Sequence, residues 1–147
     1  MKQIILVTHG DFAKGILTSL KLVMGTLDYI DFVSIHANET IPEITDMIRK
    51  KMSLYEKDTV TVIISDIAGG STTRAALELL SEKEHTYLIT GLNLGLLLEV
   101  AMLPLSGDGK TDEEALRTAI ESSKSTMALV NDRLNEDLDD ESESGEL

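Results

Sequence analysis

Four short apolar segments, each followed by a stretch with the period of an amphipathic helix, constrain the fold most strongly. The segments are rich in β-branched residues and continuous rather than alternating, as in strands covered on both faces. They are Gln3–Thr8, Asp31–Ile35, Thr59–Ser65 and Thr86–Thr90. Helices are predicted over Asp11–Met24, Ile41–Leu54, Ser71–Ser81, Asn93–Leu103 and Thr111–Lys124. This alternation predicts an α/β fold, with a mostly parallel central sheet and helices on both faces.

The ends of the predicted helices carry recognisable signals. Gly25 follows the first helix, where glycine commonly ends a helix. The segment "TIPE", Thr40–Glu43, has the pattern of a capping box with a proline in the first turn. Ser71 is predicted to cap the third helix, and Thr111 or Asp112 the last one. The connections between strands and helices are therefore expected to be short.

Length and charge limit the class of protein. A chain of 147 residues is most simply one domain, and its formal net charge of −13 argues against nucleic acid and anionic membranes as partners. The absence of cysteine excludes disulfides and thiolate chemistry. No segment has the length of a signal-peptide core or a membrane span. We therefore expect a soluble, cytoplasmic protein.

The C-terminal part departs from the pattern of the rest. Thr126–Val130, "TMALV", is predicted to be a final short strand at the edge of the sheet. Residues 132–147 hold eight acidic side chains against Arg133 alone. Such a segment buries too little apolar surface to offset its ordering entropy. We predict a domain over residues 1–131 and an acidic, disordered tail over 132–147 with at most a short helical beginning.

Polar residues follow the first and third predicted strands. His9 and Gly10 come after the first, and Asp66 and the glycine-rich segment Gly69–Thr72 come after the third. The carboxyl ends of parallel strands share one edge of a sheet, where ligands usually bind. Asp66 is expected to accept a hydrogen bond from one nitrogen of His9, leaving the other as a nucleophile.

The glycines and hydroxyls around this pair are predicted to bind an anion. Gly10 leaves the imidazole ring uncovered, and backbone N–H groups of Gly69, Gly70, Ser71 and Thr72 could form a cradle for an oxyanion. A turn and a helix cap are the simpler explanation of "GGST" when it is taken alone.

Other sites are not supported by the sequence. No P-loop or dinucleotide fingerprint occurs, and His9, His36 and His85 have no zinc-type spacing. His85 is expected at the opposite edge of the sheet. The prediction is therefore an imidazole that carries an anionic group without metal or cofactor, and a phosphoryl group exchanged between histidines fits this best.

Three motifs in order resemble a known family. "HGDFAKG", "DIAGGST" and "GLNLGLLLE" are similar to segments of the IIA component of the mannose-type sugar phosphotransferase system, and the similarity runs from Lys2 to Val130. The resemblance implies that the phosphocarrier HPr phosphorylates His9, that Asp66 orients the imidazole and that Ser71 contacts the phosphoryl group. Where some members carry an aromatic residue and a proline, this chain has Ala68 and Thr72.

The resemblance also implies partners and an assembly. The phosphoryl group would pass to a histidine of a IIB component and then to sugar crossing a membrane permease built of IIC and IID. Family members form homodimers in which a C-terminal strand, here Thr126–Val130, crosses to the partner.

Two alternatives stay open at this point. The phosphotransfer subunit of a dihydroxyacetone kinase shares this domain and its histidine. A non-catalytic regulatory module could instead hold an anion at "GGST" while His9 has only a structural role. The sequence does not reveal which sugar or sugar acid is transported.

Overall fold

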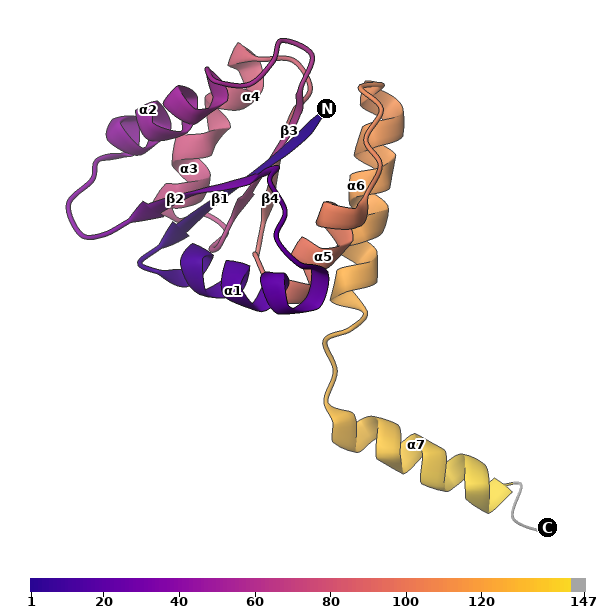
Figure 1. The fold of residues 1–147 in the computed structure, drawn as a ribbon. Helices are drawn as coiled ribbons and strands as arrows, with labels where there is room; N and C mark the ends of the chain where they lie inside the picture. The colour runs from indigo at the N-terminus through magenta and orange to yellow at the C-terminus, as the bar shows by residue number, and fades with distance from the viewer. Residues whose placement is uncertain (144–147) are drawn as a thin grey trace.

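A four-stranded parallel sheet forms the centre of the domain (Figure 1). The computed structural model describes residues 1–143. The strands are β1 (Lys2–His9), β2 (Ile30–Ile35), β3 (Val60–Ser65) and β4 (Thr86–Thr90), in the spatial order β2-β1-β3-β4. All four predicted strands are confirmed within one residue at each end, and β1 extends to include His9.

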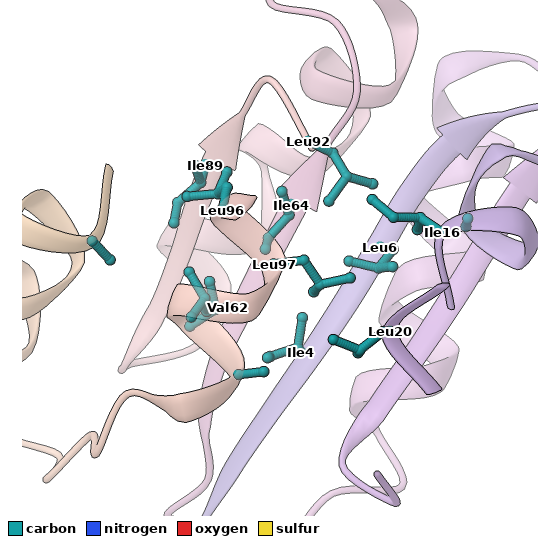
Figure 2. Packing of buried hydrophobic residues seen from close by; sticks show 14 of the residues in the cluster. Ile4, Leu6, Ile16, Leu20, Val62, Ile64, Ile89, Leu92, Leu96 and Leu97 are labelled. Atoms are coloured by element: carbon teal, nitrogen blue, oxygen red, sulfur yellow. The ribbon is translucent and has the colours of Figure 1, made fainter. Parts of the chain in front are cut away.

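Helices cover both faces of this sheet, as predicted (Figure 1). One face packs against α1 (Phe12–Met24), α5 (Leu94–Met102) and α6 (Gly109–Lys124). The other packs against α2 (Ile41–Met52), α3 (Ser71–Leu77) and α4 (Leu79–Glu82). Figure 2 shows the first of the two cores, where alternate residues of β1 and β3 meet side chains of α1 and α5. Their neighbours along each strand fill the second core, which is why these strands are continuously apolar.

The largest differences from the predicted helices concern the third and the last of them. The predicted helix over Ser71–Ser81 is divided at Glu78, which keeps helical dihedral angles, so α3 and α4 follow one another closely. Ser71 is the first helical residue rather than the cap, which is Gly70. Helix α6 begins at Gly109, before Thr111, because the buried carboxylate of Asp112 accepts hydrogen bonds from the preceding loop at Ser106 and Gly107.

The strand order decides where a site can form. Helix α1 leads from β1 to β2 on one side, whereas the chain continues from β3 to β4 on the other. The connections therefore diverge between β1 and β3, and such a switch point opens a crevice at the carboxyl ends of the strands. Val7 pairs with Ser65 in the register of these strands, which brings His9 and Asp66 to the same edge.

The C-terminal region also differs from the prediction. Residues 126–129 form no strand in the single chain, because the segment leaves the domain at the end of α6 and pairs with no strand of its own sheet. A helix follows, α7 (Val130–Glu143), where at most a short helical beginning was predicted. It extends away from the domain (Figure 1). Val130, Leu134 and Leu138 recur every fourth residue on it, which favours a helix over an irregular tail. The remainder of the predicted tail, 144–147, lies outside the described residues.

No helix within residues 1–143 combines the length and the apolar character needed to cross a membrane.

Candidate functional site

His9 is the last residue of β1, and its side chain is 44% exposed. The next residue, Gly10, has a φ of 56°, a left-handed conformation that glycine adopts without steric cost. Its N–H donates to the carbonyl of Ile35 at 2.7 Å, which turns the chain away from the sheet and into α1. The buried Thr8 hydroxyl accepts from the Ala13 N–H at 3.0 Å and fixes the start of that helix. The ring is therefore held at a rigid strand end with one side open.

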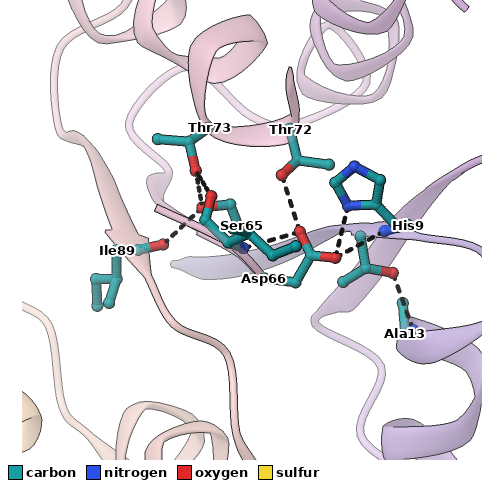
Figure 3. Close-up of polar contacts among 9 residues, drawn as sticks. His9, Ala13, Ser65, Asp66, Thr72, Thr73 and Ile89 are labelled. Atoms are coloured by element: carbon teal, nitrogen blue, oxygen red, sulfur yellow. Dashed lines mark hydrogen bonds and ion pairs between the residues drawn. The ribbon is translucent and has the colours of Figure 1, made fainter. Parts of the chain in front are cut away.

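Asp66 lies directly after β3 and contacts His9 twice (Figure 3). Its Oδ2 accepts from the backbone N–H of His9 at 2.8 Å and lies 2.9 Å from the ring Nδ1. Its Oδ1 accepts from the Ile67 N–H at 3.0 Å and from the Thr72 hydroxyl at 2.8 Å. Both oxygens of the nearly buried carboxylate are thus occupied by donors.

These contacts set the protonation of the pair. Burial acts to raise the pKa of the Asp66 carboxyl, but hydrogen bonds from the His9 backbone, the His9 ring and Thr72 outweigh it, so the pKa lies below its ordinary value. An ionised carboxylate only accepts hydrogen bonds, and Nδ1 of the neutral ring must therefore carry the proton. The lone pair then resides on Nε2, on the far side of the ring from Asp66 (Figure 3).

The segment Gly69–Thr72 closes the site beside the ring. Gly69 has a φ of 77°, and a Cβ on Gly70 would lie 3.7 Å from Cε1 of His9 and 3.3 Å from the carbonyl oxygen of Ile67. A glycine at position 70 therefore avoids a tight contact with the Ile67 carbonyl, and it places the backbone next to the imidazole, where a Cβ would make an ordinary van der Waals contact. Within the described part of the chain, the N–H groups of Ser71 and Thr72 have no hydrogen-bond partner.

The Thr72 side chain makes a contact that the sequence analysis did not predict. Its side chain is fully buried and its hydroxyl donates to Asp66, so only its backbone N–H is left for an anion. Sequence reasoning assigned it to the anion cradle and missed its contact with the carboxylate. It missed Thr8 as well. Neither side chain carries a sequence signal that separates these roles from ordinary burial.

Neither of the other two histidines has a contact with Asp66. His36 follows β2 at the same edge of the sheet, one residue beyond the Ile35 that pairs with His9, but it is exposed and its backbone N–H donates to Glu39. His85 precedes β4, at the opposite edge of the sheet, as predicted, and has a φ of 57°. In the region that the structure describes, no three His, Asp or Glu side chains gather closely enough to hold a metal ion.

Fold and site together define a class: an open parallel α/β domain that presents an oriented imidazole at its switch point. Comparison with known proteins makes this more specific. The family model described as "PTS system fructose IIA component" matches residues 3–122. The chain therefore belongs to this family of IIA components of sugar phosphotransferase systems, and the resemblance seen in the sequence is confirmed.

Individual relatives agree with the family. The chain is 30% identical over 102 residues to the sorbose-specific EIIA component of Lacticaseibacillus casei, covering 68% of this chain and 72% of that protein. It is 22% identical over 121 residues to the mannose-specific EIIAB component of Escherichia coli, covering 82% of this chain. The matched part is only 37% of that longer protein.

A solved structure shares the fold. The mannose/sorbose specific IIA subunit from Enterococcus faecalis superposes with a TM-score of 0.76 at 22% identity, covering 88% of this chain and 95% of that one. These relatives carry the names of sugar phosphotransferase systems, and they do not favour a dihydroxyacetone kinase subunit or a non-catalytic module.

Proposed function

We propose that this chain is a cytoplasmic phosphoryl relay in which His9 accepts a phosphoryl group from phospho-HPr and passes it to a histidine of a IIB component. A IIC/IID permease would then couple the transfer to sugar uptake. One observation carries the proposal: the Nδ1 of His9 is engaged by Asp66, which leaves Nε2 as an exposed nucleophile. Family membership supports the same role.

The transfer follows from this protonation state. The Nε2 lone pair attacks the phosphorus of the donor phosphohistidine, the donor P–N bond breaks, and its electron pair returns to the donor imidazole. The His9 ring, with a proton on Nδ1 and phosphorus on Nε2, now carries positive charge, and the Asp66 carboxylate 2.9 Å away stabilises it. The step to the IIB histidine repeats this chemistry in reverse. Donor and acceptor are alike, so positioning and charge shielding suffice and no metal or cofactor on this chain is required.

The phosphoryl oxygens need donors while the group resides on His9. We assign this role to the backbone N–H groups of Gly69, Ser71 and Thr72, with the Ser71 hydroxyl as an additional donor. The N–H groups of Gly10 and Gly70 already donate to the carbonyls of Ile35 and Ile67, so these two glycines contribute by leaving room for the phosphoryl group beside the ring. Support comes from the unpartnered N–H groups of Ser71 and Thr72 and from the close approach of Gly70 to the ring.

A homodimer is part of the proposal. Strand β4 lies at an edge of the sheet, and a groove runs beside it. Its lining includes the apolar side chains of Leu88, Leu116 and Ile120 together with the charged side chains of Glu113 and Arg117. Residues 126–129 leave the domain with Met127 77% and Leu129 63% exposed. An unpaired strand edge and an extended apolar segment are complementary, and we propose that this segment of each chain adds a strand to the sheet of the other.

Labelling tests the relay. Purified phospho-HPr, free of enzyme I and magnesium, should transfer one acid-labile phosphoryl group to the wild-type chain. His9→Ala should abolish labelling, whereas His36→Gln and His85→Gln should retain it, because neither residue contacts Asp66. Mass spectrometry of the intact protein and peptide mapping give the readout. Full labelling of His9→Ala, or a phosphoryl group mapped to another residue, would overturn the proposal. Failure to pass the group to any IIB domain would instead limit it to the first step.

A further inference from the structure

Thr72 occupies an unusual place for a hydroxyl beside an exposed site. Its side chain is fully buried in the first turn of α3, and its Oγ donates to Oδ1 of Asp66 at 2.8 Å. The oxygen it contacts is the one that His9 does not use. We propose that Thr72 is a positioning residue: its hydroxyl holds the Asp66 carboxylate in the one orientation that presents Oδ2 to both N–H groups of His9. The inference rests on the proposed function of His9 as the phosphoryl carrier.

A carboxylate does not fix its own orientation. The terminal torsion of aspartate is broad and roughly two-fold, so rotamer preference alone leaves the plane of the two oxygens free to turn. Donors on both oxygens remove this freedom. Oδ2 receives the backbone and ring N–H groups of His9, and Oδ1 receives the Ile67 N–H and the Thr72 hydroxyl.

Of the donors on Oδ1, Thr72 is the one that comes from a different element. Ile67 follows Asp66 in the chain and moves with it, whereas Thr72 belongs to α3. The Thr72 side chain is completely buried, and its hydroxyl is held by the hydrogen bond to Oδ1 at 2.8 Å. The position of α3 is thereby transmitted to the carboxylate and, through Oδ2, to the imidazole.

The charges around the carboxylate make this contact important during transfer. His9 on β1 is the titratable group that faces Asp66, and the donors on Oδ1 are neutral. Donation by Thr72 helps to keep the pKa of the carboxyl below its ordinary value, so Asp66 stays ionised when positive charge forms on the phosphorylated ring. Loss of the Thr72 hydroxyl would therefore leave the Asp66 carboxylate less firmly oriented and less readily ionised.

The neighbouring residue offers a matched control. Thr73 lies in the same turn and is also buried, but its hydroxyl contacts the Ser65 hydroxyl at 2.6 Å and the Ile67 carbonyl at 2.7 Å, not Asp66 (Figure 3). Thr73→Val removes a hydroxyl and its two hydrogen bonds from the same turn. It therefore reproduces the structural cost of the change at Thr72 without touching the carboxylate.

The test compares Thr72→Val, Thr72→Ser and Thr73→Val with the wild-type chain. In the unphosphorylated protein, NMR follows the carboxyl carbon of Asp66 and the ring nitrogens of His9 as the pH is varied. Thr72→Val should titrate Asp66 at a higher pH than wild type and reduce the population with the proton on Nδ1. The single-turnover rate of phosphoryl transfer from phospho-HPr to Thr72→Val should fall about tenfold. In the pH–rate profile of this transfer, the fall in rate on the acid side should begin at a higher pH than in wild type. Thr72→Ser should restore the wild-type values.

The controls separate positioning from packing. Thr73→Val should lower the melting temperature yet keep the wild-type titration of Asp66 and the wild-type transfer rate. An unchanged Asp66 titration in a folded Thr72→Val, or equal effects of Thr72→Val and Thr73→Val, would overturn the role of Thr72. If Thr72→Val does not fold, Thr72→Ala and Thr72→Ser give the same contrast, with loss of the hydroxyl in the first alone. If wild type accepts no phosphoryl group, the proposed function fails, while the two NMR readouts still test this inference.

Discussion

At the scale of single residues, the chemistry depends on the symmetry of the Asp66 carboxylate. Each of its oxygens accepts two donors, at distances between 2.8 and 3.0 Å. An asparagine amide has one accepting oxygen and one donating nitrogen. In either orientation, its NH₂ group faces a backbone N–H, that of His9 or that of Ile67. No orientation of an amide therefore reproduces the native contacts.

Asp66→Asn should consequently slow transfer by at least tenfold while the fold is retained. With the amide nitrogen toward His9, the ring must accept at Nδ1 and protonate Nε2, which removes the nucleophile. With the oxygen toward His9, the ring keeps its tautomer but loses the charge that stabilises its phosphorylated form. Single-turnover transfer from phospho-HPr measures the effect, and circular dichroism checks the fold.

Asp11→Asn is the control for charge alone. Asp11 is an exposed carboxylate two residues after His9 that pairs with Lys14 at 3.8 Å and makes no contact with the ring. Asp11→Asn should change the rate of phosphoryl transfer less than twofold, since an exposed ion pair such as Asp11–Lys14 contributes little energy. A folded Asp66→Asn that transfers at the wild-type rate would remove the carboxylate from the mechanism.

At the scale of helices and strands, the side chain of Asn93 connects α5 to α6. Its side-chain oxygen accepts from the Leu96 N–H at 2.9 Å and caps α5, and it also accepts from the Ser123 hydroxyl near the end of α6. Asn93→Ala should lower the free energy of unfolding by about 1–2 kcal/mol, because a capping bond and an interhelical bond are lost together. Urea denaturation gives the measurement.

Thr40→Ala provides the comparison for this prediction. Thr40 caps α2 through a longer bond, 3.3 Å to the Glu43 N–H, and lies exposed on the surface without a second helix attached. Thr40→Ala should lower the free energy of unfolding by about 0.5–1 kcal/mol. Equal losses for the two variants would show that Asn93 acts as a cap only and does not hold α6.

The same scale shows what the sequence could predict. The strands were predictable because both faces of the sheet are covered, which makes their apolar runs continuous. His9 and Asp66 were predictable as a pair because parallel strands end at a common edge. The role of Thr72 was not predictable from the sequence. The direction of its side chain depends on the residue at which α3 begins, which is the one after the cap Gly70. The start of α6 was missed for a similar reason: Asp112 binds a loop that has no pattern of its own.

At the scale of the whole molecule, the C-terminal region divides at Val130. Residues 126–129 are the segment that we propose to pair with a second chain. Helix α7 extends away from the domain, and the side chains of its residues 130–138 are exposed (Figure 1). Stability and assembly should therefore respond to different parts of this region.

Two deletions separate these contributions. Removing residues 137–147 takes away six acidic side chains and the end of α7. Because residues 130–138 bury little surface, this deletion should change the melting temperature by less than about 2 °C and leave the dimer intact.

Removing residues 127–147 also removes the segment proposed to lie beside β4 of the partner. It should yield a monomer with a lower melting temperature, since the groove along β4 is then left uncovered. Light scattering after size-exclusion chromatography reports the mass, and calorimetry the stability. A drop of several degrees for the shorter deletion would show that α7 packs against the domain. A dimer that persists without residues 127–147 would show that the two chains associate through another surface.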